Sequence, residues 1–472
     1  MELEVIIGLE IHAQLSTKTK LFCSCDNDAF GVQPNTRVCP VCMGFPGMLP
    51  VLNAEALRKG VEGAAALGCT IKPFSKFDRK NYFYPDLPTG YQISQFDQPI
   101  SEHGEVEIEL EGGNKIIGIT RVHLENDAGK LTHTVNGTLC DYNRAGTPLV
   151  EIVTEPDMRS PEEAQTLAKE IQKILRTVGA STADMEKGMM RFDASISMRP
   201  VGDEKLYPRT EIKNLNSFSA LLKALKYEVK KQRKAWEAGS PSTQEVTVGW
   251  LDDKEETKLL RDKESAMDYR YFPEPDLPPV TFTEKEIKDI LARIPELPLA
   301  KKHRYINDLK LTDAEALKIA ESPELYDFFE SAVDKGGEAR KIAGLFLSVV
   351  LARTDWQKTG ITPQHVSDTL ILQTEGKISA SAAKEILNAL MEDSEKTAKE
   401  IMEERGLEQK SDSGEIDAWV DQVMKENPEV VADIKAGKDK GIQFLMGQVM
   451  KMSRGSANPP LVMQAINKKL NT

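Results

Sequence analysis

The chain has 472 residues, of which 40% are hydrophobic and 29% are charged, and its formal net charge is −13. This length predicts two to four domains, and the composition is ordinary for a soluble globular protein. Acidic residues near the start argue against a secretory signal peptide, and no uncharged apolar run is long enough to span a bilayer. These properties exclude an integral membrane protein and predict a cytoplasmic protein that does not associate with membranes.

The first part of the chain, residues 1–292, predicts an α+β domain. Apolar and polar residues alternate at 4–15, 105–125 and 149–155, which indicates strands of a mixed or antiparallel sheet. Helices are expected at 53–67, 161–177 and 217–238. Asn53 is well placed as an N-cap, and Ser160 precedes a proline in the first helical turn. The predicted domain therefore combines a large sheet with a few helices.

Four of the six cysteines form a cluster within this part, as Cys23-x-Cys25 and Cys39-x2-Cys42. Disulfides are disfavoured in a reducing cytosol, so a four-thiolate zinc site is the natural interpretation. The first pair is spaced more tightly than usual, and buried free thiols or a redox pair remain alternatives. Four thiolates leave no coordination position open for a substrate. We therefore predict a structural zinc knuckle at about residues 20–45, distant from the chemistry.

A segment from Phe77 to Ile100 combines tyrosines with basic residues and amides, and we expect it to be loop-like. This mixture suits stacking on bases and contact with phosphates, as for a nucleotide or a single-stranded RNA end. Local packing of the aromatic rings is an equally good explanation.

The chain contains neither G-x4-G-K-[ST] nor G-x-G-x-x-G, which excludes the two common glycine-rich phosphate loops. Use of ATP would then depend on acidic side chains that hold magnesium. Glu10 and His12 share one face of an expected strand, as do Asp193 and Ser195. Glu125 and Glu151 lie at the ends of other expected strands. Acids that converge from several strands bind hard cations, although any single acid is more commonly a surface or salt-bridged residue.

Proline-rich segments at 273–279 and 295–298 mark a boundary, after which helical patterns such as 338–354 and 379–393 dominate. We expect a helical domain at 293–406 and a small helical tail domain at 407–472. From Lys435 onward the chain carries seven Lys or Arg against one Asp, opposite in sign to the whole. A solvated helical face is the common explanation for such a run. The alternative is phosphate binding by Lys435, Lys438, Lys440, Lys451 and Arg454.

Longer motifs run through the whole chain in order, among them IGLEIHAQL, NTRVCPVCMGFPGMLPVLN, KFDRKNYFYPDLPTGYQISQFDQPI, RVHLENDAGK, NRAGTPLVEIVTEPD, EIKNLNSF, DYRYFPEPDLPP and MGQVMKMSRGSANP. They closely resemble the B subunits of the aspartyl/glutamyl-tRNA amidotransferases. The cysteines resemble those of the zinc-bearing branch of that family.

The resemblance implies a glutamine-synthetase-like cradle domain at 1–292, followed by helical domains that help to hold tRNA. It also implies that ATP phosphorylates the side-chain carboxylate of Glu-tRNA(Gln) or Asp-tRNA(Asn), after which ammonia displaces the phosphate. The family's amidase (its A subunit) would supply the ammonia, and a small C subunit would wrap the pair. The sequence shows no Ser-Lys amidase motif and no obvious Cys-His glutaminase pair, so a separate source of ammonia is expected.

Carried over by position, the resemblance assigns Glu10, His12 and Glu125 to a magnesium site. It assigns further catalytic roles, less firmly, to Glu151, Glu186 and Asp193. The candidates for contact with ATP are Lys80, Arg191 and Ser195.

Two other functions fit part of the sequence. The first is an ATP-dependent ligase that amidates a small free carboxylic acid, for which the basic tail would be superfluous. The second is a non-catalytic, zinc-bearing RNA-binding module, against which the set of Glu10, His12 and Glu125 argues.

Overall fold

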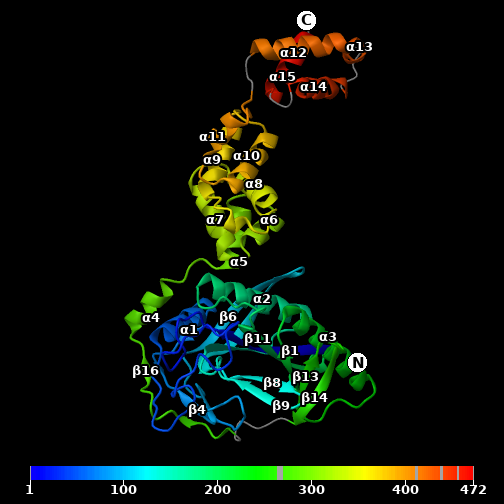
Figure 1. The fold of residues 1–472 in the computed structure, drawn as a ribbon. Coiled ribbons are helices and arrows are strands. Elements are labelled where there is room, and N and C mark those ends of the chain that lie inside the picture. Colours follow the sequence, from blue (N-terminus) through cyan, green and yellow to red (C-terminus); the bar gives the residue numbers. More distant parts are fainter. Residues whose placement is uncertain (1, 263–268, 410–412, 436–439, 454–456, 471–472) are drawn as a thin grey trace. The chain divides into compact units, whose positions relative to one another are not determined.

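The computed structural model describes residues 2–262, 269–409, 413–435, 440–453 and 457–470. The chain divides into two compact units, Met1–Leu299 and Ala300–Thr472. Figure 1 shows that the first unit contains the strands and that the second is helical. The predicted α+β class, with a mixed sheet followed by helices, is confirmed. The domain boundaries expected after residues 292 and 406 stay predictions.

The first unit is built on a nine-stranded sheet in the order β14-β13-β12-β11-β1-β10-β7-β6-β2. Its pairs are antiparallel except for β12 and β13, which run parallel. Smaller sheets pair β15-β4-β5, β16-β3 and β8-β9. The strands are β1 (Leu3–Gln14), β2 (Thr70–Ile71), β3 (Phe74–Ser75), β4 (Asp78–Asn81), β5 (Tyr91–Ser94), β6 (Ser101–Leu110), β7 (Gly113–Asn126), β8 (Lys130–Thr134), β9 (Gly137–Asp141), β10 (Pro148–Thr154), β11 (Met190–Pro200), β12 (Thr210–Leu215), β13 (Val246–Leu251), β14 (Glu256–Asp262), β15 (Phe272–Pro273) and β16 (Val280–Thr281).

Three helices of this unit lie where the sequence predicts them, namely α1 (Ala54–Ala66), α2 (Pro161–Thr177) and α3 (Phe218–Glu237). A further helix, α4 (Glu284–Leu291), was not predicted. Asn53 Oδ1 accepts from the backbone N–H groups of Glu55 and Ala56, and Ser160 accepts from Glu163. Each cap satisfies backbone donors that the first turn leaves unpaired, so both predicted N-caps are confirmed.

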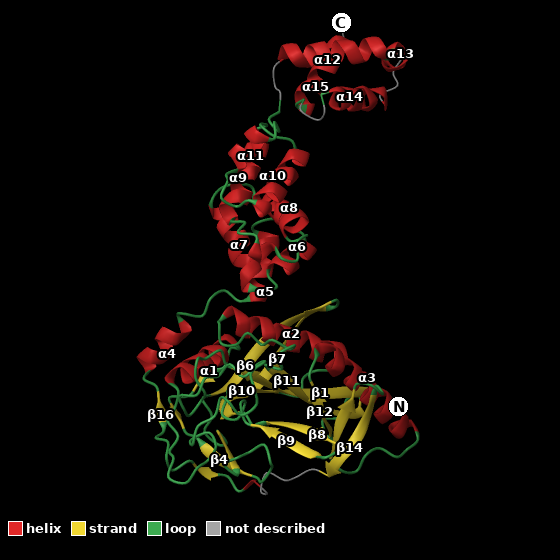
Figure 2. Ribbon diagram, viewed as in Figure 1, coloured by secondary structure: helices red, strands yellow, loops and turns green. Residues whose placement is uncertain are grey.

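Among the described residues, helices cover one face of the large sheet and leave the other free of helices (Figure 2). Figure 2 shows α1, α2 and α3 along the same side of the sheet. The odd-numbered residues of β1 from Val5 to Ala13 are buried, and Ile7, Leu9 and Ile11 belong to the same hydrophobic core as Leu167 and Ile171 of α2. Because side chains alternate along a strand, the even-numbered residues of β1 point to the opposite face. We call this opposite side the open face of the sheet.

The segment at 77–100 is more regular than expected. Its residues 78–81 and 91–94 form the antiparallel pair β4 and β5, and β15 extends that pair. The sequence-based expectation of a loop was wrong for these eight residues, while 82–90 and 95–100 are irregular as expected. The strand β15, which pairs with β4 on its other side, lies nearly 200 residues later and leaves no local signal.

The second unit contains only helices among its described residues. They are α5 (Pro298–Asn307, which begins at the unit boundary), α6 (Asp313–Ile319), α7 (Pro323–Asp334), α8 (Ala339–Leu345), the π turn η2 (Phe346–Val350), the 3-10 turn η3 (Trp356–Lys358), α9 (Pro363–Thr374), α10 (Ala380–Glu392), α11 (Ala398–Glu404), α12 (Ser413–Glu426), α13 (Pro428–Lys435), α14 (Lys440–Met452) and α15 (Pro459–Leu470). They surround two cores, one that includes Phe329, Phe346 and Leu387, and one that includes Val420 and Val449. The predicted helices at 338–354 and 379–393 correspond to α8 with η2 and to α10.

Within the described ranges, no helix combines the length and the apolar character that crossing a membrane requires.

Candidate active site

Four polar side chains form a row across neighbouring strands of the open face. In the sheet register, Arg191 of β11 lies opposite His12 of β1, and His12 lies opposite Glu151 of β10. Glu151 in turn lies opposite His123 of β7. Directly opposed residues on one face of an antiparallel sheet have adjacent side chains. The register therefore brings residues that are up to about 180 positions apart in the sequence into contact.

His12 and Glu151, at the centre of this row, form a cluster with Glu125 that we call the first acidic cluster. His12 Nε2 lies 3.5 Å from Glu151 Oε2 and 3.7 Å from Glu125 Oε1. His123 Nε2 lies 3.2 Å from Glu151 Oε2 and 3.9 Å from Glu125 Oε2. Ser94 donates a hydrogen bond to Glu125 Oε2. One nitrogen of His12 and one oxygen each of Glu125 and Glu151 all lie within 4.8 Å of one another, which suits a single small cation.

The charges of this cluster are mutually dependent. Burial raises the pKa of Glu151, but His123 and His12 outweigh burial and hold that pKa well below its usual 4.5. Burial lowers the pKa of His12, but the hydrogen bond and charge of Glu151 raise it above 6.5. Glu151 is therefore ionised at neutral pH and available to a cation.

A second acidic cluster lies beside the first and consists of Glu10, Asp193 and Glu211. Glu10 of β1 is opposite Asp193 of β11, and Glu211 lies on the next strand, β12. Lys213 Nζ bridges two of these acids, at 2.9 Å from Asp193 Oδ2 and 2.9 Å from Glu211 Oε1. These three carboxylates also offer oxygens within 4.8 Å of one another.

Burial and neighbouring carboxylates disfavour a negative charge on Glu10 in this arrangement. Burial raises its pKa above 4.5, and the carboxylates of Glu151, Asp193 and Glu211 raise it further. Glu151 belongs to the first cluster, so the two clusters are close enough to interact electrostatically. Crowded carboxylates of this kind are stabilised by a bound cation.

Arg191 is held at the edge of the first cluster by Asp127. Its Nη1 and Nη2 atoms donate to Asp127 Oδ2 and Oδ1, each at 3.2 Å. The Asp127 side chain is 2% exposed and also lies 3.4 Å from Arg144 Nε. This two-oxygen, two-nitrogen contact fixes the plane of the guanidinium group.

Lys80 lies beside a group of three tyrosine rings. Its Nζ is 4.9 Å from the centre of the Tyr269 ring, and the rings of Tyr82 and Tyr271 both contact Tyr269 edge to face. Burial lowers the pKa of Lys80, but Tyr271 and the charges of Glu125 and Glu151 outweigh it and raise that pKa. Lys80 is thus a positive charge that interacts with the first cluster.

A cavity of about 580 Å³ adjoins the second cluster on the open face. Its lining includes Glu10, Ser195, Lys205 and Arg209. A volume in this range is typical of pockets for small molecules and nucleotides. Ser195, a predicted cofactor contact, therefore faces a space that a ligand could occupy.

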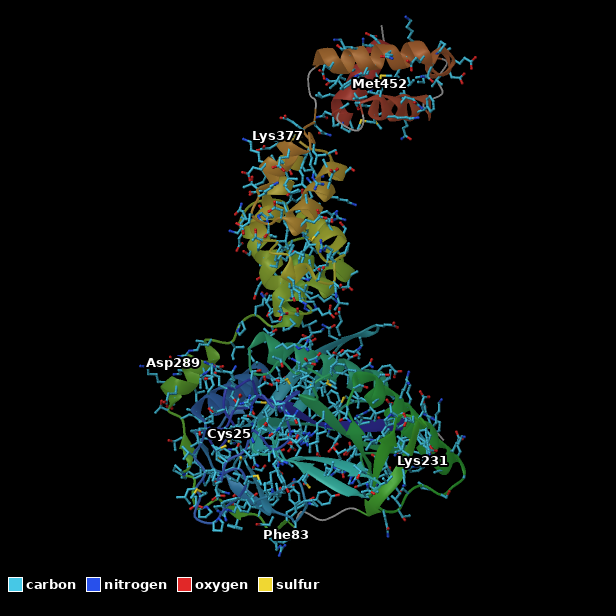
Figure 3. The ribbon with its side chains drawn as sticks, in the orientation of Figure 1. Cys25, Phe83, Lys231, Asp289, Lys377 and Met452 are labelled. Carbon is cyan, nitrogen blue, oxygen red and sulfur yellow. The ribbon has the colours of Figure 1, made fainter. Side chains whose placement is uncertain are left out.

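The four clustered cysteines converge as predicted, with sulfur atoms within 4.8 Å of one another. The backbone N–H of Cys39 donates to Cys42 Sγ at 3.2 Å. A hydrogen bond from Cys23 and the nearby charge of Lys20 lower the pKa of Cys42 to about 5. A thiolate in a four-sulfur cluster suits tetrahedral zinc. Figure 3 labels Cys25 in this segment.

A second cavity borders the cysteine cluster. Its volume is about 270 Å³, and its lining includes Cys23 and Cys42 together with Asn126 and Asp127. Asn126 directly follows Glu125 in β7. The expectation that the cysteine site is distant from the chemistry stays a prediction.

Comparison with known proteins identifies the family. Residues 5–288 match the family described as "GatB/GatE catalytic domain", and residues 327–470 match the "GatB domain". Three relatives are named as the B subunit of aspartyl/glutamyl-tRNA(Asn/Gln) amidotransferase. The chain is 48% identical to the protein of Campylobacter hominis, over 99% of this chain and 100% of that one. It is 46% identical to that of Caldanaerobacter subterraneus and 45% identical to that of Moorella thermoacetica, each over the full length of both chains.

The chain belongs to the B-subunit family of these amidotransferases. The resemblance drawn from its motifs is confirmed. The family covers both the strand-rich unit and most of the helical unit.

The structure separates the residues that were predicted together. His12 and Glu125 lie in the first cluster, whereas Glu10 lies in the second. Glu186 is exposed in the turn before β11, where its backbone N–H donates to Asp184 Oδ1, and it belongs to neither cluster.

The predicted phosphate-binding residues of the tail are described only in part. Lys451 is exposed on α14. For Lys435, at the end of α13, and Lys440, at the start of α14, only the backbone is described. Lys438 and Arg454 lie outside the described residues.

Four site residues were missed from the sequence: His123, Asp127, Glu211 and Lys213. His123 precedes Glu125 by two residues and so shares its strand face, which the alternation rule could have revealed. Glu211 and Lys213 alternate in the same way within the motif EIKNLNSF. Nothing local singled out Asp127, whose partners Arg144 and Arg191 lie on other segments of the chain.

Proposed function

We propose that this chain is the component of a tRNA-dependent amidotransferase that activates the substrate's carboxylate. In this role, ATP phosphorylates the side-chain carboxylate of Glu-tRNA(Gln), Asp-tRNA(Asn) or both, and ammonia then converts the acyl phosphate to an amide. The observation that supports this most directly is the pair of adjoining acidic clusters beside a nucleotide-sized cavity, in a chain of this family.

Each cluster would hold one magnesium ion. His12, Glu125 and Glu151 would bind one ion, and Glu10, Asp193 and Glu211 would bind the other, which divides the predicted set of Glu10, His12 and Glu125 between two sites. The ions would neutralise negative charge on the transferring phosphoryl group and on the carboxylate that attacks it.

The remaining residues orient the two reactants. The adenine nucleotide would occupy the cavity beside Glu10 and Ser195, with Arg191 and Lys80 donating to the phosphoryl oxygens. A carboxylate oxygen of the aminoacyl group attacks the γ-phosphorus as the bond to the ADP oxygen breaks. Ammonia nitrogen then attacks the acyl carbon, the carbon–oxygen bond to phosphate breaks, and the nitrogen loses a proton. The cations fixed beside both clusters would align these groups.

The partners follow from the same proposal. The family's amidase would generate ammonia from glutamine, a small C subunit would join the two, and tRNA would contact the helical unit and its basic tail. The four cysteines would hold a structural zinc ion that stabilises the segment at about 20–45.

The test combines the full chain with its partner subunits, ATP, glutamine and each mischarged tRNA, followed by identification of the amino acid released from the tRNA. We expect glutamine or asparagine, in amounts that depend on ATP. Amidation of free glutamate at the same rate would support the small-acid ligase instead. Binding of tRNA without any amidation would support the RNA-binding module.

A further inference from the structure

Lys20 is a completely buried lysine in the segment between β1 and α1. Its relative exposure is 0%, and it is among the largest fully buried side chains of the described residues. Its Nζ lies 3.4 Å from the backbone carbonyl oxygen of Tyr142 and 3.8 Å from Cys42 Sγ. Within the part of the chain that the structure describes, its Nζ therefore bonds to a sulfur and a carbonyl oxygen and forms no ion pair with an Asp or Glu.

The position of this side chain is tightly constrained. Gly146 adopts a φ of +88°, and a Cβ at that residue would lie 3.4 Å from Lys20 Cδ and 3.5 Å from Cys42 Cβ. The backbone N–H of Lys20 donates to Cys25 O at 3.0 Å. Lys20 is therefore packed between the cysteine segment and the 142–146 loop, with its charged end directed at a cysteine sulfur.

A buried ammonium group is costly unless an anion compensates for it. A backbone carbonyl at 3.4 Å accepts one hydrogen bond but carries no net charge. The anion within reach is the sulfur cluster, since a zinc ion bound to four thiolates has a net charge of −2. Such a site is itself costly to bury, so the two charges compensate for each other.

We propose that Lys20 is the internal counter-ion of the cysteine metal site. It donates to the Cys42 thiolate, reduces the net negative charge of the loaded site, and so sets how tightly zinc is held. This inference rests on the proposed zinc site. It assigns Lys20 a positioning role, because the lysine acts on the metal through Cys42.

The test compares Lys20→Met with Lys18→Met in the full-length chain. Methionine keeps an unbranched apolar stem only one atom shorter than lysine but removes the charge. Lys18 is exposed and lies two residues away, and its backbone carbonyl accepts from Asn27 rather than from a cysteine, so it serves as the matched control. Zinc affinity is measured by competition with a chelator, and the free energy of unfolding is measured for the zinc-loaded and the zinc-free protein.

We expect Lys20→Met to weaken zinc binding by about 10–100-fold, the effect typical of residues that support metal ligands, and Lys18→Met to leave it unchanged. The zinc-free Lys20→Met protein should be at least as stable as the zinc-free parent, because an uncompensated buried charge has been removed. A purely structural lysine would instead lower the stability of both forms equally.

Unchanged zinc affinity in Lys20→Met, or equal destabilisation with and without zinc, would overturn the proposal. A parent protein that binds no zinc at its cysteines would overturn it together with the zinc site. The proposed amidation would stand in every one of these cases, because its assay is independent of the metal affinity.

Discussion

Asp127→Asn tests how the candidate site holds Arg191. Asparagine has nearly the shape of aspartate, but it lacks the charge and turns an amide N–H₂ toward one of the guanidinium donors. Asp127 now accepts from Arg191 Nη1 and Nη2 and from the N–H of Ala128, and it also pairs with Arg144. The substitution leaves two arginines at the edge of the site without their common counter-ion.

The expected loss of stability follows from this geometry. Removal of one partner from a buried ion pair costs about 3–5 kcal/mol. The side chains of Arg191 and Arg144 remain 32% and 35% exposed and can regain some hydration, so about 3 kcal/mol is expected. A unit of roughly 300 residues gains roughly 0.6 kcal/mol/K of entropy on unfolding, so its melting temperature should fall by about 5 °C.

The free energy of unfolding of the Asp127→Asn variant should also depend on pH differently from that of the parent protein. Burial raises the pKa of Asp127, but Arg191 and Arg144 outweigh it and hold that pKa below 3.8. A carboxylate with a depressed folded-state pKa contributes stability that is fully present above the unfolded-state value and is lost as the pH falls through the folded-state value. The gap between parent and variant should therefore be constant near neutral pH and shrink only below about pH 4.

The assay is thermal unfolding of the full chain, together with the KM for ATP in the assembled enzyme. We expect KM to rise about tenfold, equivalent to about 1.4 kcal/mol, because Arg191 is no longer oriented. Asp26→Asn is the control, since Asp26 pairs with Arg37 at 3.1 Å where both side chains are over 40% exposed, and exposed pairs contribute less than about 1 kcal/mol. If Asp127→Asn melts within about 1 °C of the parent and keeps its KM for ATP, Asp127 does not hold Arg191.

Three further predictions concern the clusters and the tail. Glu125→Gln keeps an acceptor for Ser94 but loses the charge that binds a cation, so phosphorylation of aminoacyl-tRNA should cease. The affinity for tRNA, measured by filter binding, should stay within about twofold. Substantial turnover by this variant would show that Glu125 is not a metal ligand. Cys39→Ser should lower the zinc content and the melting temperature more than the turnover of the protein that remains folded, as measured by metal analysis and calorimetry; a full complement of zinc would contradict a four-cysteine site. Deletion of the residues after Glu415 should weaken tRNA-dependent amidation and flatten its salt dependence, without changing glutamine hydrolysis measured in the absence of tRNA; unchanged tRNA affinity would make the tail lysines a solvated surface.

Local features of the sequence were sufficient for several parts of the structure. The alternation in β1 placed Glu10 and His12 on one face, because the side-chain period of a strand is two residues. The caps at Asn53 and Ser160 marked the starts of α1 and α2, since the hydroxyl and amide groups compete locally for backbone N–H groups. The cysteine spacing indicated a four-sulfur cluster, and the long motifs identified the family.

The tertiary structure alone decided which of these residues meet. Glu151 contacts both His12 and His123 only because β10 pairs with β1 on one side and with β7 on the other, in one register. Glu211 joins Glu10 and Asp193 because β12 lies beside β11. Packing of separate segments places Asp127 and two of the cysteines around one cavity, and it brings Lys20 Nζ to 3.8 Å from Cys42 Sγ. Strand order and register arise from long-range pairing and burial, and a shift of a single residue would turn every side chain to the other face, so no local pattern could have specified them.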